Sequence, residues 1–373
     1  MTAGGTAGAS AALAHRYAPD VVAADATERA ITVDQSNRSV IVGERVVVKW
    51  LTPPRPVPHP GVTLLRHLTE FGFPEMPAFL GAHVEGDHVV AMLTEFVPGA
   101  LDGWDWYVDD LTAAIESDEL EPTMVTARHI GALAARLHAA LATPSSVVAE
   151  TVGHGTLAAE RDRAERLLAE ALAETAGATG DRLAARADRI RAALGALDPE
   201  RLTAVQPIHA DLHVGQLLRS GDTIVVNDFD GNPIGSPDEG GTSRSPLVDV
   251  ASLLQSIDHV GRIVQKRRRA DHDAIELWIA VAVPAALDAY ERARADVAAG
   301  SGMIGPGPAD GVGSRSTLPP PAARSSALLG EDGPVLFALR VVQELHEFLY
   351  AARSLPGWLY VPDGALTAMF PED

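Results

Sequence analysis

The chain has 373 residues, 46% of them hydrophobic, and a formal net charge of −20. Its length exceeds that of one compact domain, so we expect two lobes with a cleft between them. The acidic balance argues against a nucleic-acid partner, because phosphate binding needs a basic surface. No stretch approaches the run of about 18 apolar residues that spans a membrane, and Cys is absent. We therefore expect a cytoplasmic monomer without disulfides or thiolate metal sites.

The first part of the chain predicts a short tail and a small β-rich lobe. Residues 1–19 are rich in Ala and Gly and have no basic segment at the start, so they predict a flexible tail and not a secretion signal. Residues 20–98 form the predicted N-terminal nucleotide-binding lobe. Within it, the β-branched segment 30–52 predicts two or three short antiparallel strands. Residues 62–72 have helical spacing before a Gly, and 79–97 predict two strands around the turn EGD.

Residues 99–373 predict a larger helical lobe that carries the catalytic loop and the acceptor site. Apolar residues recur at helical spacing in several segments. The predicted helices cover 126–141, a hairpin over 156–197 with a break at 177–181, 249–264, 276–293 and 335–354. The strand TIVV, a flexible loop at 236–246 and a Gly/Pro/Ser segment at 300–326 that need not pack lie between them. The chain is thus predicted to be an α+β protein with a β-rich lobe before an α-rich lobe.

Two short motifs carry the chemistry: IHADLHVGQ at 208–216 and NDFDG at 227–231. Gln216, Asp228 and Asp230 offer only oxygen ligands, which suit a hard cation such as Mg²⁺. Asp211 precedes Gln216 by five residues. In phosphoryl transfer, this spacing separates the loop Asp that accepts a hydroxyl proton from the amide oxygen that holds metal. The motifs therefore predict a catalytic loop followed by a metal-binding D-F-D-G turn, with Asp230 as a further metal ligand or a substrate contact.

A lysine within an apolar run gives the motifs a nucleotide-binding partner. The chain has only two lysines: Lys266 lies in the basic run QKRRR, and Lys49 lies in VVVKW. An ammonium on an N-terminal strand suits nucleotide phosphates. The backbone of Glu95, Phe96 and Val97 then corresponds to the hinge that binds adenine, and Asp102 could reach the ribose. The order of lysine, hinge, catalytic loop and metal aspartate is that of a bilobal protein-kinase-like fold.

Each motif also has a plainer interpretation. VVVKW could be an edge strand protected by its lysine. His209 and His213 could be metal ligands, but we favour a backbone hydrogen bond that lets His209 hold the loop, and a place for His213 at the acceptor site or in the core. The sequence lacks HExxH and any Cys, which weakens a zinc hydrolase, and it lacks the P-loop GxxxxGK[ST]. A catalytically silent kinase-like binding protein also remains an alternative.

Over residues 20–370 the chain resembles the aminoglycoside-phosphotransferase-like small-molecule kinases, and more narrowly their maltokinase-like branch. The resemblance rests on LHVGQ, with Gln where most relatives have Asn, on IGALAARLHAAL, and on the last helix followed by LPGWLYVP. Two family features are missing. DQSNRSVIVG stands in place of a Gly-rich phosphate loop, and no Glu lies near position 61 to pair with Lys49.

The same resemblance implies the acceptor. Maltokinases carry YE…YE in the last helix, where this chain has QELHEFLYAARSLPGW. This altered helix and HADLHVGQ are similar to those of bacterial glucosamine kinases, which implies ATP- and Mg²⁺-dependent phosphorylation of glucosamine at its 6-hydroxyl. The amino sugar would bind among acidic side chains and His213; the acids are Asp211, Asp230, Glu344 and Glu347. Maltokinase and aminoglycoside phosphotransferase remain the alternatives.

Overall fold

The computed structural model describes residues 7–31, 37–231, 243–299 and 330–371, which fold into two compact units. The first unit comprises Met1–Asp102 and two later segments, Thr143–Glu150 and Gln216–Pro233. The second comprises Gly103–Ala142, Thr151–Gly215 and Ile234–Asp373. The segment that carries Gln216, Asp228 and Asp230 thus belongs to the first unit, whereas Asp211 belongs to the second.

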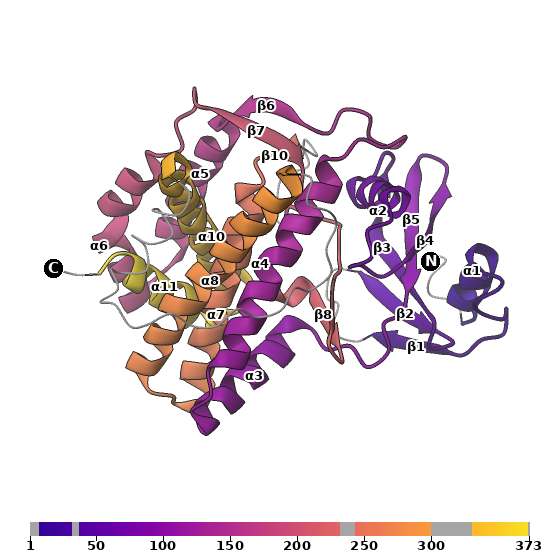
Figure 1. Cartoon of the computed structure of the whole chain (residues 1–373), viewed down its shortest axis with the longest axis horizontal. Helices are drawn as coiled ribbons and strands as arrows, with labels where there is room; N and C mark the ends of the chain where they lie inside the picture. Colours follow the sequence, from indigo (N-terminus) through magenta and orange to yellow (C-terminus); the bar gives the residue numbers. More distant parts are fainter. Residues whose placement is uncertain (1–6, 32–36, 232–242, 300–329, 372–373) are drawn as a thin grey trace. The chain divides into compact units, whose positions relative to one another are not determined.

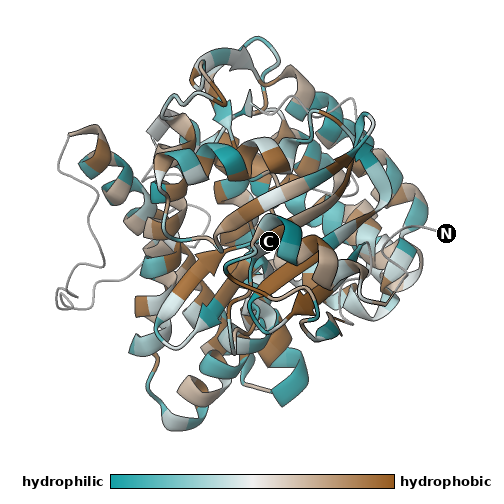
Figure 2. Cartoon of the chain, turned by 90° about the vertical axis from the view of Figure 1, so that its right-hand side faces the viewer, coloured by the Kyte–Doolittle hydropathy of each residue, from teal (hydrophilic) through white to brown (hydrophobic). Residues whose placement is uncertain are grey.

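The first unit is built on an antiparallel sheet with the strand order β1-β2-β3-β5-β4 (Figure 1). This confirms the antiparallel strands predicted for 30–52 and 79–97. In Figure 2 the strands at the centre of the view are largely hydrophobic. The strands of this unit are β1 Glu28–Ile31, β2 Arg38–Val42, β3 Val46–Pro56, β4 Phe79–Glu85 and β5 His88–Glu95, followed by the hairpin β8 Leu217–Ser220 and β9 Thr223–Val226.

The start of the chain corrects one prediction. Residues 1–19 were expected to be a flexible tail, but Ala9–Tyr17 form helix α1. Leu13 and Ala14 are buried against one face of the sheet, in a core that includes Val48 and Trp50. The carboxylate of Glu28 accepts the backbone N–H of Ala11 at 2.8 Å, which satisfies an unpaired donor of the first turn. The Ala-rich composition predicts a tail, but its small side chains let α1 pack closely on the sheet.

Lys49 points to the opposite face of the sheet from α1. Side chains alternate along a strand, so Val48 and Trp50 face the α1 core and Lys49 faces away from it. Helix α2, Pro60–Phe71, follows β3 and packs near β4. It ends at Gly72, whose φ of 79° is left-handed, as the Gly stop in the sequence predicted.

The second unit is mainly helical, and its long helices lie side by side (Figure 1). Its core is formed by apolar faces of α4 against α8 and of α7 against α8 and α10. The helices are α3 Gly103–Ser117, α4 Glu121–Ala142, α5 Ala158–Glu174, α6 Gly177–Leu194, α7 Leu247–Arg268, α8 His272–Ala298, α10 Gly333–Ser354 and α11 Tyr360–Met369, with 3₁₀ turns η2 Val214–Gln216, η4 Gly330–Asp332 and η5 Pro356–Trp358. A small sheet of β6 Gly153–Thr156, β7 Leu202–Pro207 and β10 Ser243–Arg244 accompanies them.

Three local predictions need adjustment. The break in the α5–α6 hairpin lies at residues 175–176, since the segment 177–181 begins α6. Part of the predicted loop 236–246 forms β10, which pairs with Gln206 and Pro207. The predicted flexible segment 300–326 lies outside the described residues. Among the helices that are described, none has the length and apolar character to cross a membrane.

We expect the substitution Ser10→Ala to destabilise the protein by about 1–2 kcal/mol. The hydroxyl of Ser10 on α1 accepts the indole N–H of Trp50 at 3.0 Å, and Ser10 is 1% exposed. Its loss leaves a buried donor unsatisfied. Urea unfolding followed by tryptophan fluorescence measures the effect, and Ser117→Ala at an exposed helix end is the control. Equal stability of the two variants would mean that α1 is not docked.

Candidate active site

A buried carboxylate holds the backbone of the predicted catalytic loop. The loop follows β7, and its residue Ala210 has a φ of 69°, which is uncommon for a residue with a Cβ. Asp249, in the first turn of α7, is 0% exposed and accepts the backbone N–H groups of His209 and Ala210, each at 2.8 Å. The two bonds fix the unusual turn immediately before Asp211.

Asp249 is itself fixed by a third hydrogen bond. Its Oδ2 lies 3.1 Å from His138 Nε2, and His138 Nδ1 lies 3.0 Å from the hydroxyl of Tyr290. Burial opposes the charged form of Asp249, but the hydrogen bonds and charges of His138 and His209 outweigh it and lower the pKa of the carboxyl. Asp249 therefore stays ionised, and helices α4, α7 and α8 meet at the base of the loop.

The side chains of the loop are ordered around Asp211. His209 is 0% exposed, and its Nδ1 accepts the backbone N–H of Asp211 at 3.3 Å. This confirms the structural role predicted for His209. His213 Nε2 lies 3.8 Å from Asp211 Oδ2, and its Nδ1 accepts the N–H of Gly215. Asp211 and His213 thus form one partly exposed polar group in the second unit.

Two tryptophans that the sequence analysis did not single out surround this group. Trp104 stacks on His213 with ring centroids 5.7 Å apart, and it meets Trp358 edge-on at 6.0 Å. Gly103 permits this position, because a Cβ there would lie 2.0 Å from the carbonyl oxygen of Val214. The indole N–H of Trp358 donates to Glu347 at 2.8 Å. A series of contacts through Trp358, Trp104 and His213 therefore links the predicted residue Glu347 to Asp211.

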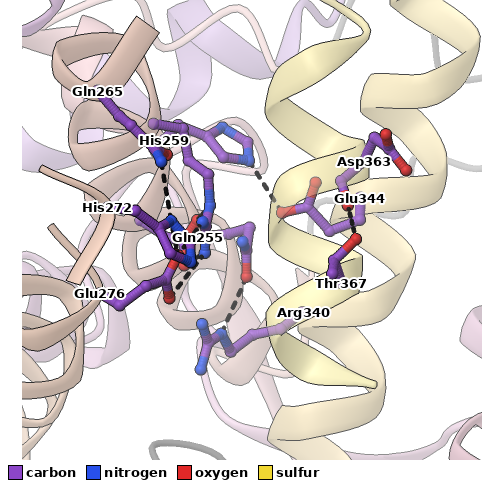
Figure 3. A network of polar contacts seen from close by, with 11 residues as sticks. Gln255, His259, Gln265, His272, Glu276, Arg340, Glu344, Asp363 and Thr367 are labelled. Carbon is purple, nitrogen blue, oxygen red and sulfur yellow. Dashed lines mark hydrogen bonds and ion pairs between the residues drawn. The ribbon is translucent and has the colours of Figure 1, made fainter. Parts of the chain in front are cut away.

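Glu344 takes a different position from Glu347, although both lie on α10. Figure 3 shows its side chain directed at His259 of α7, and the two groups lie 2.9 Å apart. Glu344 is 0% exposed, so its carboxylate is inside the protein and away from any ligand at the surface. His259 in turn stacks at 6.5 Å on Trp104 and meets Trp358 edge-on at 6.3 Å. Glu344 is therefore linked to Trp104 and Trp358 through His259.

Burial and mutual charge shift the pKa values of both His259 and Glu344. Burial raises the pKa of Glu344 to about 7, with the His259 charge opposing the shift. Burial disfavours the charged His259 ring, but the charge and hydrogen bond of Glu344 outweigh it and raise its pKa. The pair thus binds protons more tightly in the folded chain than in the unfolded one.

In the first unit, Lys49 brings the predicted metal aspartates together. Its Nζ lies 2.7 Å from Asp228 Oδ1 and 2.8 Å from Asp230 Oδ2. Burial opposes the charge of Lys49, but the two carboxylates outweigh it and raise the pKa of the amine. Strand β9 covers Thr223–Val226, as predicted for TIVV, and Asp228 follows two residues later with a φ of 58° in the left-handed region. This turn directs Asp228 and Asp230 to the same ammonium group.

The residues predicted to bind metal supply oxygen atoms that fit Mg²⁺. The described residues contain no group of three His, Cys, Asp or Glu side chains suited to a metal. Mg²⁺ does not require one, because it commonly binds one or two carboxylates together with substrate phosphates and water. Gln216 and Asp228 lie in one segment of the first unit. The backbone N–H of Asn227 donates there to the backbone carbonyl of Gln216 at 2.8 Å.

The predicted adenine hinge ends strand β5. The N–H groups of Glu95 and Phe96 donate to the carbonyls of Ala78 and Arg45, each at 2.8 Å. Among the described residues no backbone carbonyl accepts the N–H of Val97. Of the three residues predicted for the hinge, Glu95 and Phe96 thus donate to backbone carbonyls of their own unit. Asp102 is half-buried and is the last residue of the first segment of this unit, immediately before α3.

The fold, the loop with Asp211 and the lysine–aspartate cluster define a kinase-like phosphotransferase. A model of the phosphotransferase enzyme family (APH) matches residues 27–290, and the chain belongs to this family. It is 39% identical over 354 residues to the glucosamine kinase of Streptacidiphilus jiangxiensis, covering 92% of this chain and 74% of the relative. It is 36% identical to the glucosamine kinase of Mycolicibacterium smegmatis, covering 92% and 80% of the two chains.

Solved structures agree with this assignment. A glucosamine kinase in complex with glucosamine, ADP and inorganic phosphate matches with a TM-score of 0.75 and 33% identity, covering 98% of this chain and 83% of the other. A second crystal form of a glucosamine kinase matches with a TM-score of 0.77 over the same shares of the two chains. The predicted bilobal kinase-like fold class and the predicted family are confirmed.

We expect Asp249→Asn to lower turnover about 10- to 100-fold, the equivalent of one lost charge-assisted hydrogen bond. Each carboxylate oxygen accepts a backbone N–H, so the amide of Asn must direct its NH₂ group at one of these donors. Steady-state kinetics and thermal unfolding measure the effect. Tyr290→Phe, which removes only the outer hydroxyl, should cost less; an equal loss would deny the anchoring role of Asp249.

The His259–Glu344 pair predicts a pH-dependent stability. Both groups have pKa values above their ordinary ones, so the native state binds protons more tightly and the free energy of unfolding falls as pH rises. Between pH 5 and 8 we expect a decrease of about 1–3 kcal/mol in the contribution of the pair. Glu344→Gln should flatten this dependence in urea unfolding, whereas the exposed Glu116→Gln should not. Parallel curves for wild type and Glu344→Gln would contradict the assignment.

Proposed function

We propose that this chain is an ATP-dependent glucosamine kinase that forms glucosamine phosphate and ADP. The observation that carries the proposal is the match, over more than nine-tenths of this chain, to proteins named glucosamine kinase. One of them is in complex with glucosamine, ADP and inorganic phosphate. We also propose that it acts in the cytoplasm, where ATP is available, and that it acts as a monomer.

Asp211 is the proposed general base. The acceptor hydroxyl transfers its proton to the Asp211 carboxylate as its oxygen bonds to the γ-phosphorus, and the bond from that phosphorus to ADP breaks. The anchoring of the loop by Asp249 supports this role, because it holds the backbone beside Asp211 in one conformation. His213 lies beside the carboxylate and is proposed to contact the acceptor.

The first unit supplies the proposed nucleotide site. Lys49 neutralises phosphate charge, the backbone of Glu95–Val97 binds adenine, and Asp102 contacts the ribose. Gln216 and Asp228 are proposed to hold Mg²⁺, which when bound neutralises charge on the phosphates. Asp228 is suited to this role because its side chain is 36% exposed, twice the value for Asp230.

Selectivity for an amino sugar is proposed to arise from Glu347. Its carboxylate is half-buried and oriented by the Trp358 indole, so it can accept a charge-assisted hydrogen bond from an ammonium group. Trp104 and Trp358 provide apolar faces of the kind on which sugar rings pack. We propose the 6-hydroxyl as the acceptor because it is the only primary alcohol of the sugar and the least hindered.

An acceptor panel tests the function. ADP release from ATP and Mg²⁺ is coupled to a dehydrogenase assay with glucosamine, glucose, N-acetylglucosamine, maltose and kanamycin, and the product is identified by ³¹P–¹H NMR. We expect turnover on glucosamine at the 6-position, with glucose at least about tenfold poorer because it lacks the charged contact. Preferential turnover on maltose or kanamycin would identify another acceptor class.

Asp211→Asn serves as the matched control for this panel. It keeps the size of the side chain but cannot accept the proton, so kcat should fall by about 10²–10⁴ while the Kd for Mg²⁺·ATP changes little. Near-normal kcat in Asp211→Asn would refute the assigned base. Nucleotide binding without turnover on any acceptor in the wild type would favour a silent binding protein.

A further inference from the structure

The pairing of Lys49 lacks one element of the usual kinase arrangement. In protein kinases the corresponding lysine must be held by a Glu on the following helix. Here that helix is α2, and its second residue, Gly61, has no side chain to offer. Lys49 is nevertheless 17% exposed and lies within 2.8 Å of two carboxylates, both from the turn at 228–230.

Gly61 leaves a space that the Asp230 turn fills. A Cβ on Gly61 would lie 2.9 Å from Asp230 Oδ1 and 2.9 Å from the carbonyl oxygen of Phe229. Real Cβ atoms almost never approach other atoms so closely, so any other residue at position 61 would displace the turn. The first turn of α2 is thus in direct van der Waals contact with the residue that pairs with Lys49.

The two oxygens of Asp230 face different partners. Oδ2 contacts Lys49, whereas Oδ1 is buried against α2 and has no hydrogen-bond partner among the described residues. The positive end of the α2 dipole favours a carboxylate at this place. Asp228 differs, since it is more exposed and pairs with Lys49 through Oδ1. The carboxylate of Asp230 is therefore enclosed between β3 and α2, with little of its surface left for a metal.

We propose that Asp230 is a positioning residue that holds Lys49 in place of the missing helix glutamate, and that Gly61 is the residue that makes room for it. The inference rests on the proposed role of Lys49 in nucleotide binding. It assigns different roles to the two aspartates: the more exposed Asp228 exchanges Lys49 for Mg²⁺, whereas Asp230 stays with the lysine. The position of the lysine then depends on α2, as it does on the corresponding helix in protein kinases. Here the helix contributes the space left by Gly61 and not a glutamate side chain.

The chain offers a direct readout because it contains only two lysines, Lys49 and Lys266. In protein labelled with ¹⁵N-lysine, a buried, ion-paired ammonium group exchanges its protons slowly and gives a visible ¹H–¹⁵N signal. Lys266→Arg leaves Lys49 as the single lysine and assigns it. We expect Asp230→Asn to shift or broaden the Lys49 signal, and Gly61→Ala to change it in the same direction. Gly153→Ala is the control, since a Cβ there meets only Val205 at 3.7 Å.

Calorimetry of nucleotide binding distinguishes a role of Asp230 in holding Lys49 from a role in binding metal. By calorimetry, Asp230→Asn should weaken Mg²⁺·ADP about tenfold, the effect of one misplaced charged contact, with an unchanged Mg²⁺ concentration for half-maximal nucleotide binding. Asp228→Asn should raise that Mg²⁺ concentration. An unchanged Lys49 signal in Asp230→Asn, or a raised Mg²⁺ requirement, would overturn the proposal. Neither measurement needs an acceptor, so a wrong acceptor assignment would not affect the result.

Discussion

The reactive loop depends on one buried carboxylate. Asp249 has no exposed surface and accepts two consecutive backbone N–H groups, so it holds Ala210 in a left-handed conformation that the chain would otherwise disfavour. Such a buried charge is stable only when it is fully hydrogen-bonded, and His138 provides the third bond. The backbone beside Asp211 therefore depends on helices α4, α7 and α8, which contain none of the predicted site residues.

In the first unit, Lys49, Asp228 and Asp230 are also held by the need to pair buried charge. A lysine in an apolar strand must be paired to remain charged, and the turn that follows β9 brings both of its carboxylates to it. The absence of a side chain at Gly61 is as important as the presence of Asp230, because the two occupy the same space. Charge placement here is governed by packing volume as well as by residue type.

The residues predicted to contact the acceptor show what sequence reasoning could not resolve. The sequence revealed one group of predicted site residues because they lie close together in a short segment with a known spacing: Asp211, Gln216, Asp228 and Asp230. Glu344 and Glu347 were equivalent in the sequence, three residues apart on one helix, yet one is fully buried on His259 and the other contacts Trp358. Trp104, Trp358 and His259 were not singled out in the sequence, because the aromatic rings that they contact in the fold lie far from one another along the chain.

The sequence by itself determined the family and the order of Lys49, the segment 95–97 and the motifs at 208–216 and 227–231, together with most helices and strands, because local periodicity and short-range spacing encode them. Tertiary structure decided how these pieces are held. The contacts of Asp249 with His138 and with the loop span 111 and about 40 residues of sequence, and Lys49 lies 179 residues from Asp228. It also turned the Ala-rich start into a docked helix, α1. Partners so far apart are selected by burial and by the need to satisfy buried charge, which only the folded chain reveals.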